Sequence, residues 1–153
     1  MGFEIRAARP EDARFLAWAV VESGRSHRPR GFWDLLVAES DAARIDFVTR
    51  LVLAEPASWW HWTIFHIAEL DGAPAATRPA ARGHGLAQAL VAHVQDEGRR
   101  RGLRQAELTL MIGNTAAQRV YERAGFAITA EKRDAAFEAA LGCPGLAKMS
   151  CQL

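Results

Sequence analysis

The chain has 153 residues, of which 50% are hydrophobic and 24% charged, as expected of one globular domain with its own core. With 19 basic and 18 acidic residues the charge is nearly balanced, which argues against a general nucleic-acid-binding or membrane-binding surface. No apolar run approaches the length of a membrane span and no signal-peptide pattern is seen, so we expect a cytoplasmic protein. The two cysteines and five scattered histidines predict no metal site.

The first part of the chain is expected to hold one strand and three helices. Residues 3–7 alternate as a strand does, and a helix with acidic residues in its first turn begins at Arg9–Pro10. Apolar residues recur at helical spacing further on, which predicts two more helices at 32–38 and 41–53. Pro56 ends this helical region.

Two segments of this part allow more than one interpretation. The basic, polar stretch Ser23–Gly31 is either a solvated connection or a loop that borders a binding site. Three tryptophans, Trp59, Trp60 and Trp62, belong either to the core or to a pocket or dimer face. They precede a predicted hairpin, whose strands cover 63–70 and 73–77 and whose turn is Asp71–Gly72.

The stretch from Arg82 to Phe126 carries the most informative pattern. A glycine pair, Gly83 and Gly85, leads directly into an apolar stripe that recurs every four residues as Leu86, Leu90 and Val94. Glycines at the start of a helix let the backbone approach a ligand, and the unpaired first N–H groups and the helix dipole favour an anion there. We expect this helix to end near Arg101, with Gly102 as its left-handed stop.

A strand and a second helix complete this stretch. The strand is predicted at 105–112, and Asn114 is placed to cap a helix that ends at Ala124 before Gly125. Tyr121 follows Asn114 by seven residues, or two helical turns, so both lie on one helix face. Beyond it we predict a strand at 127–130, a helix at 134–141 and a final strand at 146–153.

These residues resemble a known family. The run Gly83-His84-Gly85-Leu86-Ala87 resembles the acyl-CoA loop of the GCN5-related N-acetyltransferases, the GNAT family. The run Leu108-x-Leu110-x-x-x-Asn114-x-x-Ala117-x-x-x-Tyr121-x-x-x-Gly125-Phe126 resembles the family's second motif. The resemblance implies an α/β (α+β) fold with a mixed central sheet flanked by helices. It also implies a single GNAT-like domain over residues 1–153, with the cofactor half at about 82–126.

The same resemblance implies an N-acetyltransferase that moves an acetyl group from acetyl-CoA to a primary amine by direct attack. Tyr121 matches the position that protonates the departing thiolate. No metal is implied. The acceptor remains open between a small-molecule and a peptide amine, and a homodimer with the last strand as an interface is compatible with the family. The implied cofactor-binding residues are Arg82, Gly83, His84, Gly85, Leu86, Ala87 and Asn114.

One central strand of that fold has no counterpart near residues 77–81. In the family it runs directly into the glycine loop, whereas here only Arg78-Pro79-Ala80-Ala81 separates Thr77 from that loop, and four residues with a proline cannot form a central strand. The family's oxyanion donor and often its general base lie on that strand, which leaves Glu69 and Glu107 as local candidates for the base. A non-catalytic acyl-CoA-binding or sensor module is therefore the alternative function.

Overall fold

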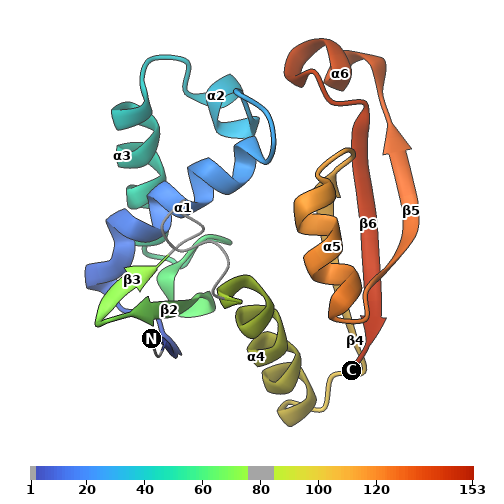
Figure 1. Ribbon diagram of the computed structural model, residues 1–153. Helices are drawn as coiled ribbons and strands as arrows, with labels where there is room; N and C mark the ends of the chain where they lie inside the picture. Colours follow the sequence, from blue (N-terminus) through green and yellow to red (C-terminus); the bar gives the residue numbers. More distant parts are fainter. Residues whose placement is uncertain (1–2, 76–84) are drawn as a thin grey trace. The chain divides into compact units, whose positions relative to one another are not determined.

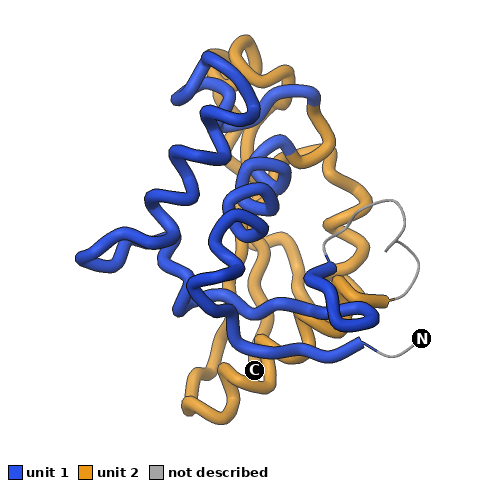
Figure 2. Tube along the Cα trace, turned by 90° about the vertical axis from the view of Figure 1, so that its left-hand side faces the viewer, with its two compact units in different colours: residues 1–25, 29–81 blue, residues 26–28, 82–153 orange. Residues whose placement is uncertain are grey.

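A computed structural model describes residues 3–75 and 85–153 (Figure 1). Gly83, which is expected to bind the cofactor, lies outside the described residues, and so do residues 77–81, where one central strand of the family has no counterpart. The described chain forms two compact units, drawn in blue and orange in Figure 2. The first contains the residues up to Arg25 and those from Pro29 to Ala75. The second contains the short segment Ser26–Arg28 and everything from Gly85 onward.

The first unit has a three-stranded antiparallel sheet in the order β1-β2-β3, together with helices that pack on one core. The core is formed by side chains that are at most 5% exposed, among them Val21, Trp33, Val48, Val52 and Ile67. The elements are β1 (Phe3–Ala7), a 3-10 turn (Pro10–Asp12), α1 (Ala13–Arg25), α2 (Phe32–Leu36), α3 (Asp41–Val52), a 3-10 turn (Trp62–Ile64), β2 (His66–Leu70) and β3 (Ala73–Ala75).

Most predicted elements of this unit are confirmed, with shifted ends. The hairpin turn is present, and Asp71 and Gly72 have the positive φ values of 52° and 77° that a tight two-residue turn between twisted strands needs. The strand predicted at 63–70 is wrong in its first residues, because a 3-10 turn holds Trp62–Ile64 and β2 begins at His66. The helix predicted from Arg9 begins instead as a 3-10 turn that leads into α1.

The tryptophan cluster divides between interior and surface. Trp62 packs against the core, and Trp60 meets the buried Trp33 edge-to-face with 5.7 Å between ring centroids. Trp59 is 93% exposed, so a core position for the whole cluster is wrong.

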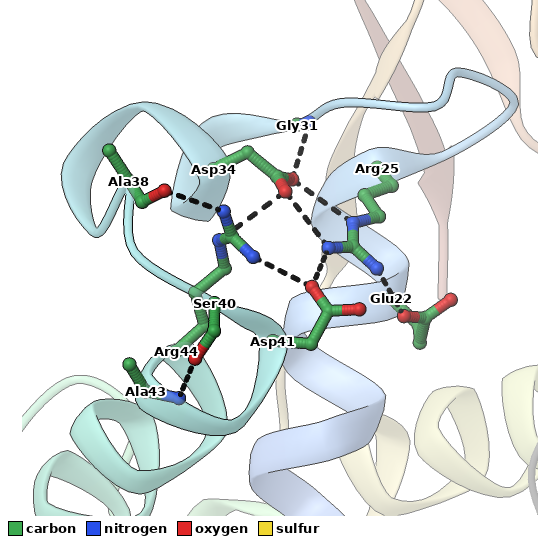
Figure 3. A network of polar contacts seen from close by, with 9 residues as sticks. All are labelled: Glu22, Arg25, Gly31, Asp34, Ala38, Ser40, Asp41, Ala43 and Arg44. Atoms are coloured by element: carbon green, nitrogen blue, oxygen red, sulfur yellow. Dashed lines mark hydrogen bonds and ion pairs between the residues drawn. The ribbon is translucent and has the colours of Figure 1, made fainter.

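A network of charged side chains joins the three helices of the first unit (Figure 3). Arg25, the last residue of α1, contacts Asp34 of α2 at 2.9 Å and also reaches Asp41 of α3. Arg44 of α3 lies 3.3 Å from Asp34 and 2.7 Å from Asp41. Asp34 also accepts the backbone N–H of Gly31 at 2.9 Å. Arg25 is thus part of a helix and of a partly buried network, so a solvated connection is wrong for this part of Ser23–Gly31.

The second unit has its own antiparallel sheet in the order β4-β6-β5, with α4 and α5 packed against each other. Its core is formed by Leu110, Phe126, Ala147, Met149 and Cys151. The last strand lies between β4 and β5, so it has no free edge for the interface that the sequence suggested. The elements are α4 (Leu86–Arg100), β4 (Gln105–Met111), α5 (Thr115–Arg123), β5 (Ala127–Arg133), α6 (Ala135–Leu141) and β6 (Gly145–Gln152).

The stripe of α4 differs from the predicted one. Leu86 is buried, but Val94 is 53% exposed, and the neighbouring Gln95 takes the interior position with 7% exposure. The Gln95 side chain donates to the backbone oxygen of Ala124 at 2.8 Å and to the sulfur of Cys151 at 3.3 Å. A polar side chain can occupy this position because its donors are satisfied, and it ties α4 to the end of α5 and to β6.

Candidate functional site

The start of α4 has the geometry that the glycine motif predicted. Gly85 has φ 72°, precedes the first helical residue Leu86, and accepts the N–H of Ala89 at 2.9 Å to close the first turn. Gly85 has no side chain with which to cap the first N–H groups, so those groups are available to an anion. Leu86 itself is 6% exposed, so its side chain packs inward and only its backbone could serve a ligand. The predicted residues Arg82, Gly83 and His84 lie outside the described residues.

Asn114 caps α5 and also reaches a segment that is distant in the sequence. Its Oδ1 accepts the backbone N–H of Ala117 at 3.2 Å, which confirms the predicted cap. Its Nδ2 donates to Ser26 Oγ at 2.7 Å, across 88 positions of the chain. Sequence reasoning missed Ser26 because nothing in its neighbourhood marks this contact. Ser26 follows the last residue of α1 directly and has φ 59° in the structure.

His27 lies against the turn that precedes Asn114. A Cβ added at Gly113, which has φ 94°, would lie only 3.2 Å from His27 Nε2, so glycine suits this position in both conformation and space. Ser26 Oγ lies 3.3 Å from His27 Nδ1. The desolvation of the ring lowers the pKa of His27, and the positive charge of Arg28 lowers it further. The imidazole is therefore mainly neutral at pH 7.

Tyr121 is half-buried on α5. Its ring meets that of Phe126 edge-to-face with 5.9 Å between centroids and packs on the core of the second unit. Burial raises the pKa of Tyr121 above its ordinary value, so the phenol keeps its proton at neutral pH. None of the described residues forms a hydrogen bond with the hydroxyl. A protonated hydroxyl without a structural partner is suited to donate to a ligand.

The two carboxylates considered as bases are already paired. Glu69 lies 2.7 Å from Arg6 Nε, and the same guanidinium contacts Asp12. Glu107 is 2.8 Å from Lys148. Each carboxylate is held by a cation of this chain and is not free to approach an acceptor amine, so neither residue is favoured as the base.

The described residues contain no group of three or more metal-ligating side chains of the His, Cys, Asp or Glu type. Within the same residues, none of the helices combines the length and apolar character required to span a bilayer.

The sequence was compared with models of known families and with characterised proteins. The family model described as "Acetyltransferase (GNAT) family" matches residues 11–126, which include the start of α4 and all of α5. A mycothiol acetyltransferase from Salinispora arenicola is 34% identical over 144 residues, covering 82% of this chain and 45% of its own length. The chain thus spans less than half of that relative. The alignment is also longer than the part of this chain that it covers, so the relative carries residues in this span that the chain lacks.

Solved structures show the same fold. An N-acetyltransferase from Staphylococcus aureus Mu50 has a TM-score of 0.69 at 15% identity, with 98% of this chain and 100% of that chain covered. The yncA protein of Salmonella typhimurium, solved with its cofactor acetyl-CoA, has a TM-score of 0.62 at 19% identity, with 100% and 95% covered. These similarities confirm the expected α+β fold class with flanking helices.

Proposed function

The chain belongs to the acetyltransferase (GNAT) family, and from this premise we propose that it transfers an acetyl group from acetyl-CoA to a primary amine. The observation that carries the proposal is the family match, which extends over both the glycine-led helix α4 and the Asn114–Tyr121 helix α5. We further propose that residues 1–153 act as a single domain, because the matched span 11–126 contains residues of both compact units.

The proposed roles follow from the local geometry. Backbone N–H groups of Leu86 and Ala87, with Gly85, hold the pyrophosphate at the start of α4. Arg82, Gly83 and His84 extend this loop, as the family motif implies. Asn114 fixes the pantetheine arm of acetyl-CoA or orders a water there, in addition to capping α5.

The reaction itself needs little covalent chemistry from the protein. The neutral amine attacks the thioester carbonyl, a C–N bond forms, and the C–S bond breaks as the tetrahedral intermediate collapses. The amine loses a proton to a base or water chain, and Tyr121 donates its proton to the departing thiolate. Positioning of the two reactants supplies much of the rate enhancement.

The alternative is a module that binds acyl-CoA without transfer. Two observations favour it: the short connection between β3 and α4 in the sequence, and the residues that the Salinispora relative has in the aligned span and this chain lacks. Such a module would keep the phosphate site at α4 while lacking the family's oxyanion donor.

Two measurements on the same protein separate these functions. Acetyl-CoA should raise the melting temperature under both, because a ligand that binds only the folded state stabilises it. Release of free CoA thiol is then followed over a panel of primary amines. Amine-dependent thiol release supports the transferase, and binding without release on any amine supports the module. No stabilisation by acetyl-CoA would contradict both functions.

We also propose a cytoplasmic location and a homodimer. The cysteines Cys143 and Cys151 are buried and free, as suits a reducing compartment. In the described part of the chain β5 is hydrogen-bonded only to β6, which leaves one edge open for a second copy. Sedimentation of the purified protein across a concentration series tests the dimer, and a monomer throughout would contradict it.

A further inference from the structure

The guanidinium of Arg28 lies near the turn from α6 to β6. Its terminal nitrogen Nη1 is 3.9 Å from the position that a Cβ would take at Gly142, in the turn from α6 to β6. Its neighbours Ser26 and His27 contact the turn from β4 to α5. These two turns are linked directly, because the sulfur of Cys143 lies 3.3 Å from the backbone oxygen of Ile112. The segment Ser26–Arg28 therefore spans one continuous surface of this unit.

The Nε atom of Arg28 is buried and has no hydrogen-bond acceptor among the described residues. Three buried side-chain atoms of the described residues have no hydrogen bond: Nε of Arg28, Nε of Arg44 and Nε2 of His61. Arg44 Nε lies 3.3 Å from the Asp34 carboxylate, and His61 Nε2 lies 3.8 Å from that of Glu55. No carboxylate of the described chain lies within ion-pair distance of Arg28. A buried donor without an acceptor is costly. Arg28 as a whole is only partly buried, and its terminal nitrogens are not among these buried atoms, so they are open to an acceptor supplied by a ligand.

The segment is held in place rather than free. Ser26 keeps φ 59°, an uncommon conformation for a residue with a side chain, while its hydroxyl accepts the hydrogen bond from Asn114. A segment that is already held at Ser26 has less conformational freedom to lose when a ligand binds at Arg28. An arginine presented in this way offers a planar fork of donors that matches a carboxylate.

We propose that Arg28 binds a carboxylate of the acceptor, so that the acceptor is a molecule with both a primary amine and a carboxylate, such as an amino acid or a short peptide. This inference rests on the proposed acetyl transfer and narrows its acceptor. Ser26, two residues before Arg28, is hydrogen-bonded to Asn114, which caps the helix that carries Tyr121, so the segment that holds Arg28 is attached at the start of α5.

A binding measurement tests the proposal without any turnover. In ¹⁵N-arginine-labelled protein the side-chain Nε–H signal of Arg28 is assigned by its loss in Arg28→Gln. Free amino acids, dipeptides and the matched amino-acid amides, whose carboxylate is neutralised, are then titrated separately. We expect the signal to shift with the carboxylate compounds and not with the amides. Equal shifts with the amides, or no shift with any compound, would overturn the proposal. The comparison of amino acids with dipeptides identifies which source of carboxylate fits.

Steady-state kinetics give a second, independent arm. Arg28→Gln should raise KM for a carboxylate-bearing acceptor about tenfold or more, since it removes a charge-assisted hydrogen bond. KM for acetyl-CoA and the rate with amide acceptors should be unchanged. Arg28→Lys, which keeps the charge but not the fork, should give an intermediate KM. Arg30→Gln is the matched control, because Arg30 is exposed and two positions away.

The two arms separate this inference from the function on which it rests. Transfer that proceeds with the same carboxylate preference in Arg28→Gln would refute the role of Arg28 and leave the acetyltransferase intact. A shifted Arg28 signal with no transfer to any amine would support the carboxylate site and refute catalysis. Melting curves of each variant confirm that the comparison is made on folded protein.

Discussion

Asn114 holds Ser26 by a hydrogen bond of 2.7 Å from Nδ2 to Oγ, while its own Oδ1 caps α5. One side chain thus starts a helix and fixes a segment that follows α1. The bond explains why the short stretch Ser26–Arg28 belongs to the second unit although the residues around it belong to the first.

Substitution of Ser26 by alanine and by glycine should change the free energy of unfolding by different amounts. Ser26→Ala loses the hydroxyl and keeps the unfavourable φ of 59°, whereas Ser26→Gly loses the hydroxyl but adopts that φ without strain. We expect Ser26→Ala to lower the free energy of unfolding by about 1 kcal/mol more than Ser26→Gly. Urea unfolding of the two variants and the parent measures this difference, and equal stabilities would show that the backbone conformation carries no cost.

Tyr121→Phe separates chemistry from packing. The ring contact with Phe126 is kept, and none of the described residues hydrogen-bonds the hydroxyl, so we expect the melting temperature to change little. Loss of the proton donor should lower kcat by roughly 10²-fold, at the lower end of the range for acid catalysis, with KM for acetyl-CoA nearly unchanged. An unaltered kcat would exclude Tyr121 as the donor, and a large loss of stability would assign it a structural role.

Asp34 is expected to be the most sensitive carboxylate of the first unit. Its side chain is 7% exposed and contacts both Arg25 and Arg44. Asp34→Asn removes the buried carboxylate that Arg25 and Arg44 share, leaves them only the exposed Asp41 in common, and should cost about 3 kcal/mol of unfolding free energy. Asp46→Asn is the control, since its pair with Arg14 is 60% and 68% exposed and should cost less than about 1 kcal/mol. Similar losses in both variants would contradict a special role for the network.

The same carboxylate predicts an acid limit to stability. The hydrogen bond from Arg25, together with that from Gly31 and the charges of Arg25 and Arg44, lowers the pKa of Asp34 to about 2. The unfolded chain therefore binds a proton at this group at a higher pH than the folded chain does. The stabilisation is fully present above a pH of about 4 and is lost as the pH falls towards 2. Unfolding curves between pH 5 and pH 2 should show this loss in the parent and a weaker one in Asp34→Asn.

The pKa of His27 is expected to depend on the charge of its neighbour Arg28. Desolvation and then the charge of Arg28 lower the pKa of His27, so Arg28→Gln should raise that pKa while leaving it below the ordinary value. Because the folded pKa is depressed, this group's contribution to stability decreases as the pH falls below about 6.5. The Cε1–H resonance of His27 followed by NMR across pH 4–8 measures the pKa, with Arg30→Gln as the control. An unchanged pKa in Arg28→Gln would mean that the two side chains do not interact.

The parts of this protein that the sequence predicts well are those set by local rules. Gly102, Gly125 and Gly142 each have a positive φ at the end of a helix, and Asn114 caps the helix it was expected to cap. These outcomes depend on a few consecutive residues, and the alternating or helical spacing of apolar side chains supplies the rest.

The parts that it does not predict depend on contacts between distant residues. Gln95 looks like a surface residue of an amphipathic helix, and only the oxygen of Ala124 and the sulfur of Cys151 make its burial favourable. From the sequence Glu69 is expected to be solvated, but in the structure Arg6 of β1 donates a hydrogen bond of 2.7 Å to it. Ser26 meets Asn114 across 88 positions of the chain, and Arg28 lies near the turn at Gly142; no local pattern encodes either neighbour.

The position of Ser26–Arg28 in the chain has a practical consequence for dissecting the protein. A gene fragment that encodes only residues 85–153 would produce the β4-β6-β5 sheet without the hydroxyl that Asn114 binds and without the imidazole that covers Gly113. The second unit is therefore not a contiguous piece of sequence, and it can be neither expressed nor exchanged between relatives in complete form by a single cut. A chimaera that exchanges this unit between relatives would need to include Ser26–Arg28 together with the C-terminal half.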